Sequence, residues 1–129
     1  MSTYERVRIA APPAAVVEEL RAVLAERAIT EYVVVDHGHD MAAAGAPAFE
    51  AWTLIFGSPA AGSRILALDL AAAVDLPLRL AVIAADGGAS EIVLRDMASL
   101  LDGAAAPLAD QFTGVLRGLA QEVGDRLTG

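Results

Sequence analysis

The sequence has 129 residues, a length that fits one domain and can bury roughly two-thirds of the surface that the unfolded chain exposes. Apolar residues make up 56% of it, yet no stretch is long and pure enough to cross a bilayer, and charges interrupt the apolar residues near the N-terminus where a secretory signal needs a continuous block. We therefore expect a single cytoplasmic domain over residues 1–129, with no membrane partner.

The charged residues and the absence of cysteine exclude some classes of partner and of chemistry. Acidic side chains outnumber basic ones by 17 to 9, which gives a net charge of -8, and every basic residue is an arginine placed singly along the chain. A nucleic-acid partner needs a basic patch that releases counterions from the phosphate backbone, so we expect none. The absence of cysteine excludes disulfides, thiolate nucleophiles and cysteine-ligated metals.

The first half of the chain predicts, in order, a strand over residues 3–10, a helix from Pro13 to about Ala28, a strand over residues 30–37 and a helical turn over residues 40–45. Alternation in the first strand places Val7 and Ile9 on one face. The next strand contains Tyr-Val-Val-Val, whose branched and aromatic side chains favour a pleated surface. Asp40 is expected to cap the helical turn.

The second half predicts a strand over residues 51–57, a helix over residues 59–68, strands over residues 78–85 and 90–96, and an amphipathic helix at the end of the chain. Trp52, Leu54 and Phe56 should share one side of their strand. Ser58 followed by Pro59 is a helix-start signal. The last two strands are joined by a short glycine-containing link typical of an antiparallel hairpin.

The order β-α-β-β-α-β-β-α contains a hairpin and few βαβ crossovers. Such an order favours the α+β class over a parallel α/β fold. We therefore predict a two-layer sandwich in which helices pack on a mostly antiparallel five-stranded sheet.

Four motifs resemble the bacterial and archaeal family called domain of unknown function 302. They are Val35-Asp36-His37 with an alanine-rich turn ending at Gly45, Ile55-Phe56-Gly57-Ser58-Pro59, Gly62-Ser63, and Asp75-Leu76-Pro77-Leu78. Ser58 stands where asparagine is usual in the family, and Leu66 where methionine is common. Serine caps a helix almost as well as asparagine, so the inferred fold is unaffected. A role that needs the side-chain amide of asparagine at position 58 is not expected in this chain. The resemblance implies a compact sandwich that often self-associates, and no established activity.

Both histidines lie in Asp36-His37-Gly38-His39-Asp40, at the end of a predicted strand. If the strand reaches His39, His37 and His39 point to the same face, as a pair of metal ligands requires. If Gly38 breaks the strand, His39 turns away and the cluster is a solvated strand end. Alternatively, His37 could act as a general base, with Asp36 beside it.

The residues Gly57, Ser58, Gly62 and Ser63 mark the entry into the second helix, where free backbone N–H groups could face an anion. The spacing matches neither a P-loop nor a dinucleotide-binding fingerprint, and proline removes one donor. A tight strand-to-helix connection explains the same small residues.

The sequence therefore predicts a non-catalytic module that self-associates, as a homodimer, or binds a small molecule, with no cofactor. The candidate binding residues are Asp36, His37, Gly57, Ser58, Gly62 and Ser63, and no catalytic or metal-ligating residue is assigned. The alternatives are a metal-binding protein and a hydrolase or isomerase that uses Asp36 and His37.

Overall fold

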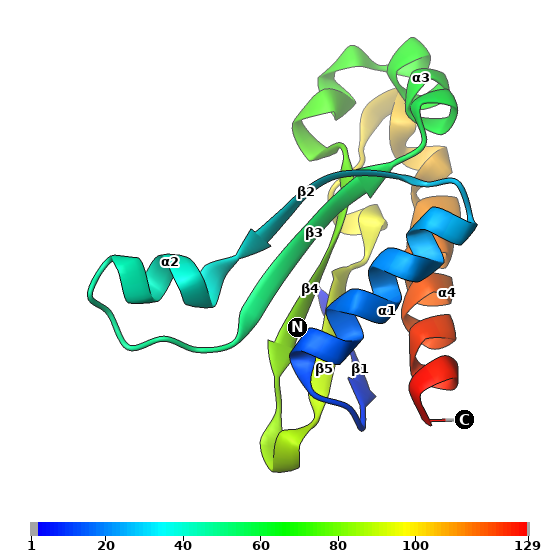
Figure 1. Cartoon of the computed structure of the whole chain (residues 1–129). Helices are drawn as coiled ribbons and strands as arrows, with labels where there is room; N and C mark the ends of the chain where they lie inside the picture. Colours follow the sequence, from blue (N-terminus) through cyan, green and yellow to red (C-terminus); the bar gives the residue numbers. More distant parts are fainter. Residues whose placement is uncertain (1–2, 129) are drawn as a thin grey trace.

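The computed structural model describes residues 3–128 and contains one antiparallel sheet of five strands, in the order β1-β5-β4-β3-β2 (Figure 1). The strands are β1 (Tyr4–Ile9), β2 (Thr30–Asp36), β3 (Ala51–Gly57), β4 (Leu78–Ala84) and β5 (Ser90–Arg95). The α-helices are α1 (Pro13–Glu26), α2 (His37–Ala43), α3 (Pro59–Leu68) and α4 (Ala109–Thr128), and the 3-10 segments are η1 (Leu70–Asp75), η2 (Asp86–Gly88), η3 (Met97–Ser99) and η4 (Gly103–Leu108). The predicted α+β fold is confirmed.

One face of the sheet is covered by α1 and α4, which lie side by side (Figure 1). Every second residue of the central strands points to this covered face, as the two-residue period of a strand requires. These side chains are Leu54, Phe56, Leu80, Val82, Ile92 and Leu94, and each is at most 2% exposed. They form the core with apolar residues of both helices, so the stability of the fold depends on this side of the sheet.

The alternate residues of the same strands point to the opposite side, which we call the open face. Thr53, Ile55, Ala81, Ile83 and Val93 are only half-buried there. The described residues therefore leave this face partly exposed to solvent. None of the helices within residues 3–128 is both long enough and apolar enough to span a membrane.

The helix α2 begins and ends earlier in the sequence than the helical turn predicted over residues 40–45. The preceding strand ends at Asp36, and a helix begins at His37. The Asp36 carboxylate accepts a hydrogen bond from the His39 backbone N–H at 3.0 Å, so Asp36 rather than Asp40 is the cap. A Cβ at Gly38 would lie 2.8 Å from the Phe49 carbonyl oxygen, so this close approach requires glycine. In Figure 1, α2 and the adjoining strand ends extend away from the rest of the molecule.

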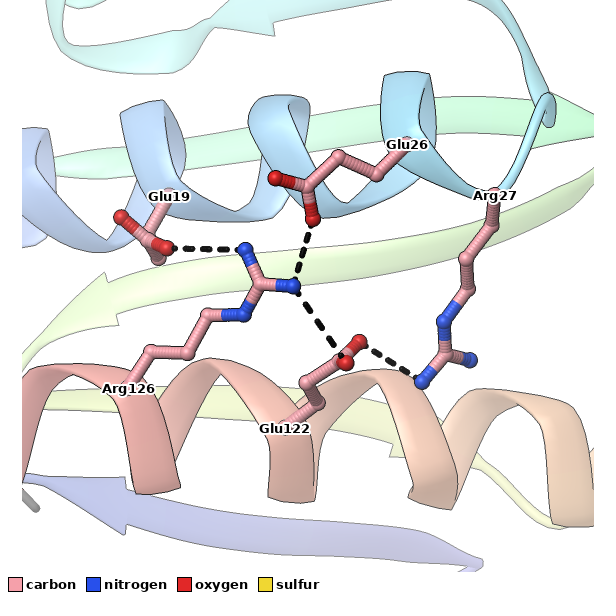
Figure 2. Close-up of polar contacts among 5 residues, drawn as sticks. All are labelled: Glu19, Glu26, Arg27, Glu122 and Arg126. Atoms are coloured by element: carbon pink, nitrogen blue, oxygen red, sulfur yellow. Dashed lines mark hydrogen bonds and ion pairs between the residues drawn. The ribbon is translucent and has the colours of Figure 1, made fainter.

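An ion-pair network joins α1 to α4 (Figure 2). The Arg126 guanidinium reaches Glu19 and Glu122, each at 3.4 Å, and also Glu26, while Arg27 reaches Glu122 at 2.7 Å. The hydrogen bond from Arg126 holds the pKa of the Glu26 carboxyl below its usual range. Because these side chains are partly exposed, their contribution is small beside that of the core.

Candidate functional site

Four of the predicted binding residues line a single pocket of about 370 Å³ at the start of α3. These four are Gly57, Ser58, Gly62 and Ser63, and we call the site the α3 pocket. The remaining lining residues come from β2, α3, η1, the η1–β4 connection, the start of β4, and α4: Tyr32, Pro59, Ala61, Leu66, Ala73, Leu76, Pro77, Leu78 and Phe112.

The local sequence explains this shape. The Ser58 hydroxyl accepts from the Ala61 backbone N–H at 3.3 Å and so caps α3, as predicted. A Cβ at Gly57 would be in van der Waals contact with the Tyr32 ring at 3.6 Å and with Pro77 at 3.7 Å. A Cβ at Gly62 would meet nothing within 4 Å. The two glycines therefore leave space that side chains would fill.

The α3 pocket is lined mainly by apolar side chains, with a few hydroxyl groups. The Ser63 hydroxyl donates to the Pro59 carbonyl at 2.7 Å, while the Ser58 hydroxyl acts as an acceptor in the cap and keeps its own proton to donate. The volume of the α3 pocket lies within the range of small-molecule sites. The arrangement suits a small, mostly apolar molecule with one or two hydrogen-bonding groups.

Asp36 and His37 lie far from this pocket. In the β2–β3 register Thr30 faces Gly57, whereas Asp36 faces Trp52. Six residues of extended chain separate the two points, a distance of about 20 Å. The structure therefore does not bring all six predicted residues into one site.

The histidine cluster does not have the geometry on which the metal hypothesis depends. His37 and His39 belong to α2, where residues two apart point in different directions. His37 Nε2 is 2.7 Å from the Thr53 hydroxyl, and the Asp36 carboxylate is bonded to backbone rather than to the His37 ring. Within residues 3–128, no group of three or more histidine, aspartate or glutamate side chains is placed to hold a metal ion.

A second pocket of about 380 Å³ lies on the open face, and sequence analysis did not predict it. We call it the arginine pocket, because Arg79 of β4 and Arg95 of β5 both line it. Its other lining residues are Tyr4, Thr53, Val74, Asp75, Pro77, Leu78, Ala81, Val93, Leu94, Met97, Leu100 and Leu116. Strand alternation was the available signal, because it places both arginines on the side away from the core.

Comparison with known proteins agrees with the fold. A crystal structure of an uncharacterized conserved protein, DUF302, from Bacillus stearothermophilus superposes with a TM-score of 0.80, covering 98% of this chain and 99% of that chain. The two sequences are 16% identical, so this likeness shows the fold alone. No curated protein matches the sequence. A family model matches residues 5–129, and the chain therefore belongs to the family described as domain of unknown function DUF302.

Proposed function

We propose that this domain is a non-catalytic module that binds a small, mostly apolar molecule in the α3 pocket. The observation that supports this most directly is the convergence of Gly57, Ser58, Gly62 and Ser63 on one concave site of about 370 Å³. Apolar pockets of this size with a few polar groups are the usual form of ligand sites.

The chemistry of the lining favours binding over catalysis. Apart from the Tyr32 phenol, no described residue that lines the α3 pocket carries an ionisable side chain. Acid-base and nucleophilic catalysis need several ionisable groups directed at one point. A lining of this kind instead supplies apolar contact area and hydroxyl groups that orient a ligand.

A substitution that fills the α3 pocket without disturbing the fold tests this proposal. We expect Gly62→Leu to place its side chain in open space, and leucine is also the better helix former. Indole serves as the probe, since it is apolar and carries a single N–H donor. In an NMR titration, indole should shift the amide signals of Gly57 and Gly62 in the wild-type protein.

The Gly62→Leu variant should bind indole at least about tenfold more weakly, a loss of about 1.4 kcal/mol. The control is Ala60→Leu, which adds the same side chain to an exposed position of α3 that does not line the pocket. Equal affinity in the wild type and Gly62→Leu would refute the proposal.

Self-association is the second candidate function, and the edge strand β2 favours it. Tyr32 and Val33 are 49% and 47% exposed on an edge that carries no charge from Tyr32 to Val35. The other edge strand, β1, has arginine at two alternate positions, which protects an edge against pairing. Two copies could pair along β2 around a twofold axis and form the expected homodimer.

Sedimentation velocity at micromolar concentration tests this candidate. The wild type should sediment as a dimer, and Val33→Lys should shift the population to monomer because a charge opposes pairing at the edge. The control is Leu70→Lys, since Leu70 is 77% exposed and lies outside the sheet. A wild-type protein that sediments only as a monomer would exclude this candidate.

A further inference from the structure

We propose that the arginine pocket binds a small organic anion through Arg79 and Arg95, with the apolar part of the ligand against the walls of the pocket. The anionic group would be a carboxylate or a phosphate, the two groups that the planar guanidinium recognises with paired hydrogen bonds. This site shares only Pro77 and Leu78 with the α3 pocket, and the inference does not depend on the proposed function.

In the described part of the chain, Arg79 and Arg95 lack the carboxylate partners that most of the arginines have. Five of the nine arginines form ion pairs with glutamate: Arg6, Arg21, Arg27, Arg117 and Arg126. Within residues 3–128, Arg79 and Arg95 form none, although acidic side chains outnumber arginines by 17 to 9. Two arginines that form no ion pair with the described residues therefore line one pocket of a strongly acidic protein.

Arg79 and Arg95 lie on neighbouring strands of the sheet, β4 and β5. Ala81 of β4 faces Val93 of β5, so continuing this antiparallel register by two residues brings Arg79 to the level of Arg95. Both side chains then lie on the open face. Like charges at opposing positions of two strands repel each other and destabilise the sheet. An anion held between the two guanidinium groups would turn this repulsion into attraction.

Arg95 is held in place by its neighbours. Its guanidinium donates to the Thr3 hydroxyl and to the Tyr4 hydroxyl, and lies 4.6 Å from the centre of the Tyr4 ring. A cation positioned over an aromatic ring is attracted to its face. These contacts orient Arg95 before a ligand arrives, which reduces the entropy lost on binding.

The remaining lining residues define the ligand further. Asp75 also lines this pocket, so the charges of its ionised lining residues, Arg79, Arg95 and Asp75, sum to one positive charge. A net charge of one in the lining of the pocket favours an anion of low charge. Apolar wall positions are supplied by Val74, Pro77, Leu78, Val93 and Leu100. We therefore infer a ligand with one anionic head group and a short apolar body.

Two probes distinguish the possible head groups: hexanoate carries a carboxylate, and hexyl phosphate carries a phosphate on the same alkyl chain. Calorimetric titration of the wild-type protein should show saturable binding of at least one probe. The probe that binds more tightly identifies the head group. Failure of both probes to bind saturably would overturn the inference.

Arg79→Gln should weaken the binding of the tighter probe at least about tenfold, because it removes a charge-assisted contact. The matched control is Arg64→Gln, which changes the net charge equally at an exposed arginine of α3 that forms no ion pair within residues 3–128. Equal weakening in the two variants would show that only net charge matters, and would refute the site.

Arg79→Glu separates binding from folding. This variant places opposite charges on the two strands, so its melting temperature should rise above that of the wild type while probe binding is lost. Retained probe binding in Arg79→Glu would contradict the proposal. Gly62→Leu should bind the probe normally, because Gly62 does not line the arginine pocket. Failure of the α3 pocket and failure of the arginine pocket are thus distinguishable.

Discussion

The two faces of the sheet use the same strands for different purposes. On the covered face of β4, Leu80 and Val82 are fully buried. On the open face of the same strand, Arg79 is exposed, and Ala81 and Ile83 are only half-buried. A two-residue period lets one strand support the core and, at adjacent positions, present side chains to solvent.

The largest expected effect comes from truncating one residue on each face of β4. Leu80→Ala should lower the free energy of unfolding by about 2–5 kcal/mol, because it leaves a cavity in the core. Ile83→Ala, three residues along the same strand, should cost only about 1 kcal/mol, since its side chain is already partly exposed. Urea denaturation followed by circular dichroism measures both values.

The same two variants test whether the open face is exposed in solution. If Ile83→Ala destabilises the protein as much as Leu80→Ala, the open face is buried in solution. Repeating the measurement at several protein concentrations then identifies the cover, because stability that depends on concentration indicates a second copy of the chain.

The covered face was largely predictable from the sequence because its signals are local. Alternation placed Leu54 and Phe56 on one side, and Ser58-Pro59 located the start of α3 at the correct residue. The α2 segment was mispredicted because two aspartates compete as its cap. In the structure, the Asp36 carboxylate accepts from the His39 backbone N–H, and a helix starting at His37 also needs glycine at position 38, where the chain approaches the Phe49 carbonyl.

The candidate sites were less predictable, since a pocket combines residues from separate elements. The small residues near Ser58 identified one wall of the α3 pocket, but not Tyr32 or Phe112, which come from other parts of the fold. Nothing in the single placement of the arginines along the chain indicates that Arg79 and Arg95 line one pocket. Their proximity follows from the register of β4 with β5, which hydrophobic periodicity does not determine.

The smallest expected effect concerns the rim of the covered face, where Glu5 of β1 pairs with Arg117 of α4. The hydrogen bond from Arg117 holds the pKa of the Glu5 carboxyl below its usual value of 4.5. The unfolded chain therefore takes up a proton before the folded protein does. The stabilisation from this pair is present above about pH 4.5 and is lost as the pH falls through the lowered pKa.

Glu5→Gln should accordingly flatten the fall in unfolding free energy between about pH 5 and pH 3, as measured by urea denaturation at each pH. The control is Glu18→Gln, because Glu18 is exposed on α1 and forms no ion pair within residues 3–128. A matching change of slope in both variants would mean that overall charge, rather than the contact between β1 and α4, governs acid stability. A change confined to Glu5→Gln would place this acid-sensitive contact at the edge of the covered face, where a helix meets the sheet.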